Sequence, residues 1–244
     1  GKSGRTALSC YLAPLKEKYK IDFTIVNGEN SAHGKGITPR IYKEFTQWGV
    51  DCITLGNHAF SKHNIVEELN LCPKLVYPNN HPSINNGFGD KIFEVNGQCI
   101  NVLGNAFMLP EPSCSCFDLM HQALKTIDKN DCVIVDFHGE ATAEKRAFFE
   151  IFNNRCSIIY GTHTHVQTAD EMIKNGCAFI SDVGMVGAYD SVLGRDIHES
   201  LQLYRGKKTR YLPSDNPAII CAIVVCLDEK TLQAKTIKRI QIRP

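Results

Sequence analysis

Two histidines separated by one residue, His163 and His165, follow a short apolar run at residues 157–160. The run predicts a buried strand, which Gly161 would end. Side chains at positions i and i+2 of extended backbone point to the same side, so two imidazoles would leave one strand end together. This arrangement suits a metal ion better than a hydrophobic core, although a surface turn can carry the same residues.

Three other predicted strands are each followed directly by side chains that bind metals. These strands and side chains are 23–26 with Glu29 and Asn30, 52–55 with Asn57 and His58, and 132–137 with His138. In open α/β sheets, functional sites lie at the carboxyl ends of the strands. We therefore predict that these side chains gather at one edge of a sheet.

Each candidate also has an ordinary structural explanation. Asn57 suits a turn, Asn30 suits an Asx turn, and Glu29 could be a solvated loop acid. His138 could be a hydrogen-bonded core histidine. Asp182, which follows a predicted strand at 177–181, either supports a ligand histidine or shapes a turn, and we favour the turn. A functional role is favoured over these alternatives only because metal-binding residue types follow four predicted strands.

The candidate donors are carboxylate and amide oxygens and imidazole nitrogens, without thiolate. This set is typical of catalytic Mn, Fe or Zn rather than of a closed structural zinc. Six candidate ligands exceed the need of one ion: Glu29, Asn30, Asn57, His138, His163 and His165. Two ions about 3.5–4 Å apart that share a carboxylate account for the set. Such a pair holds a phosphoryl group and activates a water.

The bulk properties exclude some function classes. A net charge of +1 gives no electrostatic basis for binding duplex nucleic acid, and we interpret the basic run at 205–210 as a solvated loop. The longest apolar run, 218–227, is too short to span a bilayer, and no signal peptide is visible. The 11 cysteines form no Cys-x-x-Cys pattern, so we expect reduced thiols in a cytoplasmic protein.

The order of predicted elements indicates one domain, residues 1–244, in the α/β class. Helices are expected at 6–18, 38–47, 61–69, 117–127, 143–152 and 197–204, and further strands at 91–95, 99–103, 218–227 and 233–242. Residues 1–5 are expected to be a loop, and residues 71–90 to be mostly loop. Asn96-Gly97 predicts a hairpin turn. Alternating strands and helices followed by hairpins predict a mixed sheet core, with two sheets packed face to face between helices.

Five long stretches resemble the YmdB-like family of bacterial calcineurin-type metallophosphoesterases, which is similar to 2′,3′-cyclic-nucleotide phosphodiesterases. The stretches are NGENSAHGKGITP (27–39), GNH (56–58), DFHGEATAEK (136–145), GTHTHVQTADE (161–171), and DVGMVG with SVLGR (182–195). They span nearly the whole chain. The resemblance implies a four-layer α/β/β/α sandwich that carries a dinuclear centre.

The resemblance also implies a role for each candidate residue. Glu29 would bridge the ions, and His58 would be the general acid that protonates the leaving oxygen. The remaining ligands would divide between the ions as Asn57, His138 and His163 on one side and His165 with Asn30 on the other. We expect Fe or Mn, or else Zn, with a small phosphodiester or nucleotide as substrate. A homo-oligomer is a further expectation.

One metal ligand of the family has no counterpart in the sequence. The family carries a Gly-Asp motif at the end of its first strand, and its Asp binds a metal. This Asp would fall just before Gly1, because residues 1–5 match the segment that follows the motif. We expect the native protein to contain the Asp.

Three functions remain open on the sequence. The first is a phosphodiesterase that hydrolyses small diesters such as 2′,3′-cyclic nucleotides with a metal-activated water. The second is a phosphomonoesterase or phosphoprotein phosphatase, which would use the same metal chemistry behind different pocket walls. The third is a non-catalytic metal-binding regulator.

Overall fold

The computed structural model describes residues 1–86, 93–94 and 97–244. Its helices are α1 (Lys2–Tyr19), α2 (Pro39–Gln47), α3 (His63–Glu67), α4 (Cys116–Thr126), α5 (Thr142–Phe152) and α6 (Ile197–Tyr204), with 3-10 turns η1 (Leu69–Leu71) and η2 (Pro82–Asn86). Its strands are β1 (Ile25–Asn27), β2 (Cys52–Thr54), β3 (Leu75–Val76), β4 (Phe93–Glu94), β5 (Gln98–Leu103), β6 (Val133–His138), β7 (Ile158–Thr162), β8 (Met172–Lys174), β9 (Cys177–Ile180), β10 (Val186–Ala188), β11 (Ala218–Leu227) and β12 (Ala234–Ile242).

These strands form three sheets. The largest has the order β4-β5-β6-β7-β9-β8, with parallel pairs in its centre and an antiparallel pair at each end. The sheet β1-β2-β3 is parallel, and β10-β11-β12 is antiparallel. The predicted mixed α/β class is confirmed, whereas the four-layer arrangement stays a prediction.

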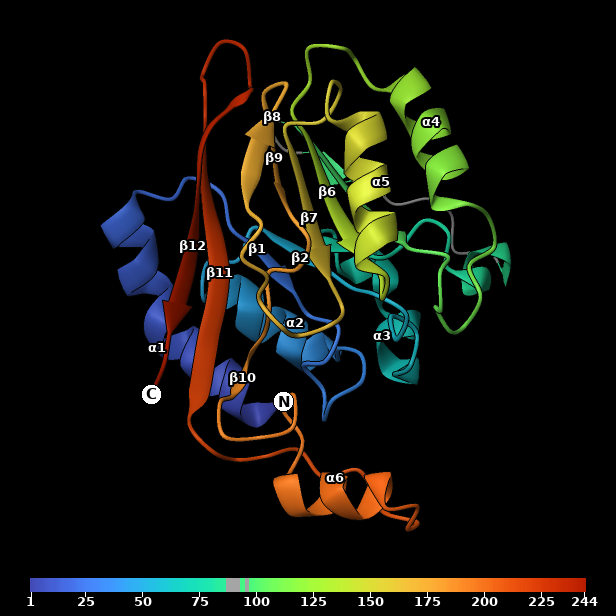
Figure 1. Ribbon diagram of the computed structural model, residues 1–244, viewed down its shortest axis with the longest axis vertical. Coiled ribbons are helices and arrows are strands. Elements are labelled where there is room, and N and C mark those ends of the chain that lie inside the picture. The colour runs from blue at the N-terminus through green and yellow to red at the C-terminus, as the bar shows by residue number, and fades with distance from the viewer. Residues whose placement is uncertain (87–92, 95–96) are drawn as a thin grey trace.

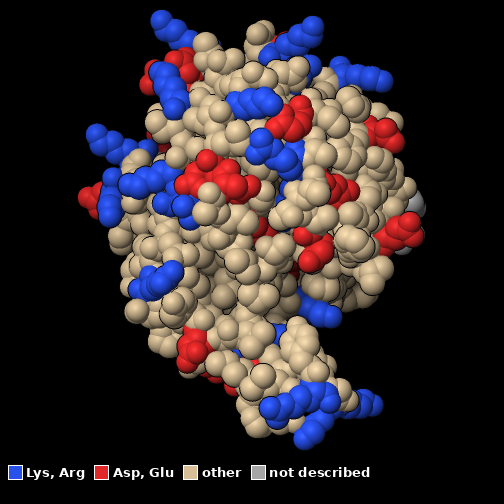
Figure 2. Space-filling model, in the orientation of Figure 1, with Lys and Arg blue, Asp and Glu red and all other residues tan. Residues whose placement is uncertain are grey.

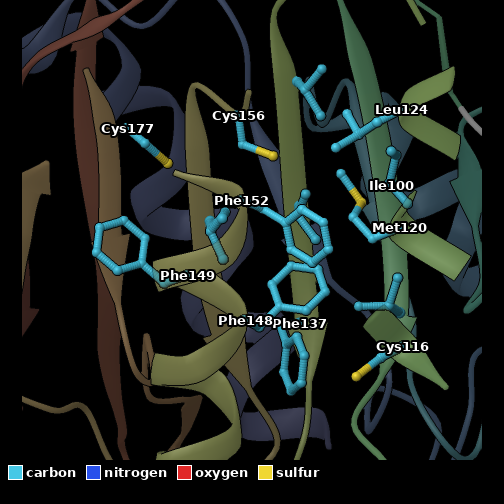
Figure 3. Packing of buried hydrophobic residues seen from close by; sticks show 14 of the residues in the cluster. Ile100, Cys116, Met120, Leu124, Phe137, Phe148, Phe149, Phe152, Cys156 and Cys177 are labelled. Atoms are coloured by element: carbon cyan, nitrogen blue, oxygen red, sulfur yellow. The ribbon is translucent and has the colours of Figure 1, made fainter. Parts of the chain in front are cut away.

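The largest core cluster lies between the six-stranded sheet and helices α4 and α5 (Figures 1 and 3). Phe148 of α5 contacts Phe137 of β6 at 4.8 Å and Phe152 at 4.6 Å between ring centroids. Phe148, Phe149 and Phe152 are buried and recur at helical spacing. This stripe fixes which face of α5 covers the sheet.

A second cluster packs α2 against the parallel sheet. Ile41 and Phe45 of α2 lie with Ile53 of β2 in one buried group. The expected cap is present, because the backbone N–H of Ile41 donates to the Thr38 hydroxyl at 3.3 Å. A small third cluster, Cys52, Val76 and Cys99, joins β2 and β3 to β5. The parallel sheet and the six-stranded sheet therefore share a buried contact.

Two glycines that suggested loops or strand ends lie inside regular elements. The expected loop at 1–5 is wrong, because α1 begins at Lys2. A Cβ at Gly4 would lie 2.1 Å from the Val186 carbonyl oxygen, and one at Gly161 would lie 1.8 Å from that of Ser181. Gly161 therefore continues β7 instead of ending it. Both glycines allow close backbone packing, which depends on partners far along the chain.

Other boundaries differ for local reasons. The expected loop at 71–90 contains β3, whose two residues are too few to show a period, and the expected helix at 61–69 divides into α3 and η1. The hairpin β8–β9 was not predicted, although Asn175-Gly176 supplies two positive φ angles of 51° and 77° between its strands. Residue 96 of the expected Asn96-Gly97 turn lies outside the described residues.

Helix α6 lies apart from the main body at the lower end of Figure 1. On the face in Figure 2, acidic and basic side chains intermingle over the body, and basic side chains gather at the lower end that α6 occupies. Among the residues described, none of the helices combines the length and apolar character that crossing a bilayer requires.

Candidate active site

The predicted site residues follow the carboxyl ends of neighbouring strands. His138 ends β6 and pairs in register with Thr162, which ends β7. In the parallel sheet, the end of β1 pairs with the end of β2, at Asn27 and Thr54. The two sheets also meet here, because Asn27 and Thr54 both donate hydrogen bonds to Asp136 of β6. The strand ends from both sheets thus supply one site.

His138 is the centre of the first half of this site, which we call the His138 half and which also contains Asn57 and His163. The Nε2 atom of His138 lies 3.1 Å from the Asn57 Oδ1 atom and 3.1 Å from the His163 Nδ1 atom. It lies 4.0 Å from the Glu29 Oε1 atom. A Cβ at Gly56 would come within 2.3 Å of this nitrogen, so only glycine fits before Asn57.

Hydrogen bonds fix which nitrogen of each imidazole carries its proton. The Thr162 hydroxyl donates to Asp136 Oδ1 at 2.6 Å, so it accepts from the Nδ1–H of His138 at 2.9 Å. The Nε2–H of His163 donates to Glu140 at 3.0 Å. The His138 Nε2 and His163 Nδ1 lone pairs therefore face each other beside the Asn57 carbonyl oxygen. Three acceptors that converge without a donor form a site for a cation.

Glu29 adds a buried carboxylate beside these acceptors. Its side chain is 1% exposed, and the backbone N–H of His58 donates to its Oε1 atom. The Oε2 atom has no hydrogen-bond partner within the described part of the chain. Burial raises the pKa of Glu29 to about 8, against backbone hydrogen bonds from His58 and Gly56. A cation would satisfy the unpartnered oxygen and favour the ionised carboxylate.

The second half, which we call the His165 half, contains His165 and Asn30. The His165 Nε2 atom lies 3.1 Å from the Asn30 Oδ1 atom. The amide nitrogen of Asn30 donates to the Gly34 carbonyl oxygen at 2.8 Å, which turns its Oδ1 atom toward the imidazole. The backbone nitrogen of Gly1 donates to the Asn30 backbone carbonyl at 3.0 Å. The start of α1 therefore adjoins this half.

His163 and His165 do not project from extended backbone as expected. Their φ angles are 103° and 66°, both in the left-handed region that non-glycine residues seldom adopt. Each histidine consequently reaches a different partner, His163 toward His138 and His165 toward Asn30. The expectation that the two imidazoles leave on one side is wrong, but the loop joins both halves of the site.

A buried ion pair holds the loop that carries the two histidines. The Lys145 Nζ atom donates to the Thr162 carbonyl oxygen at 2.9 Å and to Asp182 Oδ2 at 3.0 Å. Asp182 also accepts from the backbone N–H of Thr164 at 3.0 Å. Both charged side chains are at most 1% exposed. The predicted turn at Asp182 is present, because the backbone N–H of Gly184 donates to the Asp182 carboxylate. The same carboxylate also supports the loop that carries the two histidines.

His58 lies at the open side of the cluster. Its side chain is half-buried and borders a hollow of about 260 Å³. Burial first, and then the charges of Lys35, His163 and His81, lower the pKa of His58 to about 4. In the absence of a bound anion the imidazole is therefore neutral at pH 7.

The residues fit a metal by donor type and orientation rather than as a ready-made cage. Within residues 1–86, 93–94 and 97–244, no three His, Cys, Asp or Glu side chains are grouped to hold an ion by themselves. In the His138 half, one amide oxygen and two imidazole nitrogens converge, and the unpartnered oxygen of Glu29 belongs to a carboxylate beside them. Mixed oxygen and nitrogen donors suit Mn, Fe or Zn.

Three supporting residues received no role from the sequence: Thr162, Asp136 and Lys145. Lys145 had a readable signal, because it stands three, four and seven residues before the phenylalanines of the buried stripe on α5. A lysine on an apolar helix face needs a buried partner. Asp136 lies inside β6 and Thr162 is the last residue of β7, and nothing in the local sequence distinguishes either of them.

Comparison with known proteins places the chain in a family. Residues 1–240 match the family described as YmdB-like protein. A 2′,3′-cyclic-nucleotide 2′-phosphodiesterase of Bacillus subtilis (strain 168) is 39% identical over 99% of this chain and 93% of its own length. The chain belongs to the YmdB-like family, as its motifs predicted.

Two solved structures share the fold. A crystal structure described as a novel phosphatase, from Mycoplasma pneumoniae, superposes with a TM-score of 0.93 at 34% identity, over 99% of this chain and 89% of that one. A hypothetical protein from Thermus thermophilus gives a TM-score of 0.87 at 29% identity, over 98% and 94% of the two chains.

Proposed function

We propose that this protein is a phosphodiesterase that hydrolyses small diesters such as 2′,3′-cyclic nucleotides at a dinuclear metal centre. The observation that carries the proposal is the convergence of the His138, His163 and Asn57 acceptors beside the buried Glu29. The related proteins are a phosphodiesterase and a phosphatase by name, which confirms the expectation of a hydrolytic enzyme.

The two halves of the site would hold one ion each. Asn57, His138 and His163 would bind the first, His165 and Asn30 the second, and Glu29 would bridge them. Bound ions would neutralise phosphate charge and lower the pKa of the attacking water. We expect Fe or Mn, or else Zn, because all three accept this donor set.

The protein residues around the ions would orient the substrate and supply a proton. His58 would donate this proton to the leaving oxygen. A bound phosphodiester brings negative charge next to His58, and this charge raises the pKa of the imidazole against the burial that lowers it. The Lys145–Asp182 ion pair and the Thr162–Asp136 hydrogen bond would hold the ligand histidines in place throughout.

The proposal is tested with 2′,3′-cyclic AMP as substrate for the full chain supplied with Mn²⁺ or Fe²⁺. We expect turnover that a chelator abolishes and that His58→Asn lowers by about 10²–10⁴-fold. Absence of turnover in protein shown to contain two metal ions per chain would refute the proposal.

A phosphomonoesterase is the second candidate, because one structural relative is described as a phosphatase. It would use the same ligands and differ in the pocket walls. A comparison of kcat/KM for 2′,3′-cyclic AMP and for p-nitrophenyl phosphate separates the two activities. The third candidate, a non-catalytic metal-binding regulator, predicts no turnover of either substrate.

We further infer the finer features that the resemblance implies. The buried contact between β2, β3 and β5, with α2 and α5 on the far faces of their sheets, supports a four-layer α/β/β/α sandwich in one domain. We also expect a cytoplasmic homo-oligomer that acts on small substrates, without binding membranes or duplex nucleic acid.

A further inference from the structure

The hollow beside His58 adjoins the ligand cluster without belonging to it. Its volume is about 260 Å³, and Asn57 is its only candidate metal ligand. The other side chains that line it are His58, Phe60, Ser61, His81, Ser83 and Pro110. The side-chain amide of Asn57 donates to the Leu109 carbonyl at 2.8 Å, which holds the neighbouring Pro110 at the rim.

The described residues that line the hollow include no Lys, Arg, Asp or Glu side chain. A phosphate in the hollow would lose hydration without a lysine or arginine in the described lining to pair with it, whereas a neutral group would not carry this cost. The hollow therefore selects an uncharged part of a ligand.

One wall of the hollow is a fixed pair of rings. The rings of Phe60 and His81 meet edge to face, with centroids 4.8 Å apart and an interplanar angle of 72°. His81 accepts the backbone N–H of Ser83 at its Nδ1 atom, 3.2 Å away, so its Nε2–H donates to the Asn57 carbonyl at 3.3 Å. Because both nitrogens are engaged, His81 offers a ligand only its ring surface, which suits a heterocycle.

Two hydroxyl groups complete the lining. No hydrogen bond within the described part of the chain engages the side-chain hydroxyls of Ser61 and Ser83. Each can donate to or accept from a sugar hydroxyl or a ring nitrogen. The volume is slightly below the roughly 300 Å³ at which pockets for drug-sized ligands begin. It therefore suits one ring system rather than a dinucleotide.

We propose that this hollow is the subsite for the nucleoside part of the substrate, with the phosphate outside it beside His58. The inference rests on the proposed function, in which His58 is the general acid. A general acid lies next to the leaving oxygen that it protonates. The group that carries this oxygen must then extend into the space beside His58, and the hollow is the uncharged space there. Its ring wall and hydroxyls match a base and a ribose.

The test compares two five-membered cyclic diesters in the Mn²⁺-loaded protein. One is 2′,3′-cyclic AMP, and the other is glycerol 1,2-cyclic phosphate, which has the same reacting group but no nucleoside. In Ser83→Met the longer side chain fills the hollow, and we expect the kcat/KM ratio of the two substrates to fall at least tenfold, mainly through KM. Ser83→Ala removes only the hydroxyl and should lower the ratio by about threefold.

Ser9→Met, on the exposed surface of α1, is the matched control and should keep the ratio of the wild type. An unchanged ratio in Ser83→Met would overturn the subsite while leaving the proposed function intact. If the wild type hydrolyses neither diester, the proposed function fails, and adenosine binding measured by NMR decides on the subsite alone. Binding that Ser83→Met abolishes supports the subsite, and absence of binding to the wild type overturns it.

Discussion

The two halves of the candidate site differ in how much of the protein supports them. In the His138 half, the imidazole is hydrogen-bonded through Thr162 to Asp136, which also accepts from Asn27 and Thr54. In the His165 half, the His165–Asn30 contact is backed by the hydrogen bond from the Asn30 amide to the Gly34 carbonyl, by the hydrogen bond from Gly1 to the Asn30 carbonyl, and by a hydrogen bond between His165 and the Leu193 backbone. The first half is built into two sheets, and the second connects two loops.

This difference indicates unequal roles for the two ions that we propose. Supporting hydrogen bonds fix the orientation of a ligand and raise its affinity for metal. We therefore expect the His138 half to bind its ion first and more tightly. The His165 half, with less support, should exchange its ion more readily. Among the supports found in the described part of the chain, the Lys145–Asp182 ion pair serves both halves, because it holds the loop between His163 and His165.

The largest expected effect comes from breaking that shared support. Lys145→Met leaves Asp182 charged and buried without its cation, so the free energy of unfolding should fall by about 3–5 kcal/mol. Both ions should be lost together, because the backbone of both histidines loses its anchor. Urea unfolding and metal content per chain measure the two effects.

Lys174→Met provides the control, since Lys174 pairs with Glu150 at the surface, where both side chains are more than one third exposed. An exposed pair of this kind contributes at most about 1 kcal/mol. Similar losses of stability in Lys145→Met and Lys174→Met would contradict the role given to the buried pair.

An intermediate effect is expected from Thr162→Val, which changes only the His138 half. Valine keeps the shape of threonine but removes the hydroxyl that sets the His138 tautomer. We expect the affinity for the first ion to fall by about 10–100-fold, while the second ion is less affected. Metal titration with a competing chelator measures both affinities.

Thr126→Val is the matched variant for this change, because the Thr126 hydroxyl contacts only the Ala123 carbonyl in its own exposed turn. Its metal affinities should equal those of the wild type. A Thr162→Val protein that weakens both ions equally would remove the distinction between the halves.

The candidate site residues that follow strands are easier to predict from the sequence than the residues that hydrogen-bond to them. Glu29, His58 and His138 could be found because metal-binding and acid–base residue types follow apolar runs. Asp136 stands inside one of those runs and Thr162 two residues after another, and their hydrogen bonds with each other and with His138 form only when β6 and β7 pair in register. Local sequence carries no record of that register.

The backbone conformation at His163 and His165 also differs from the prediction. The alternation rule placed His163 and His165 on one side, but it holds only in extended backbone, and both residues have positive φ. The ion pair that imposes this geometry joins residues 37 positions apart. The loop predicted at residues 1–5 and the strand end predicted at Gly161 are also wrong. At Gly4 and Gly161 the backbone that packs closely comes from residues far along the chain, which local sequence does not show.

A smaller effect is expected from Asn30→Ala in the His165 half. His165 remains and still offers its nitrogen, but the amide oxygen is lost. We expect about a tenfold weaker second ion and an unchanged first ion, since no described hydrogen bond links Asn30 to the Asp136 network. Chelator titration decides this, and loss of the first ion would show that the halves are one cooperative unit.

The smallest expected effect is a pH dependence of the metal-free protein, which probes the Glu29 carboxylate beside the His138 half. Burial raises the pKa of Glu29 from 4.5 to about 8, so between these values the folded state holds a proton that the unfolded state has released. The contribution of Glu29 to stability is then present below about pH 4.5 and is lost as the pH rises to about 8.

Other groups of the site titrate in the same window, and some have the opposite sign. Burial lowers the pKa of His58, His138 and His165, so their contribution rises with pH as they lose protons in the unfolded state. The difference in unfolding free energy between wild type and Glu29→Gln cancels these contributions. This difference should decline between about pH 5 and 8 in protein stripped of metal and should lose that decline when metal is restored, because the ion replaces the proton. A difference that does not change with pH in the stripped protein would mean that Glu29 is already ionised, and that the unpartnered oxygen reflects packing rather than a place for a cation.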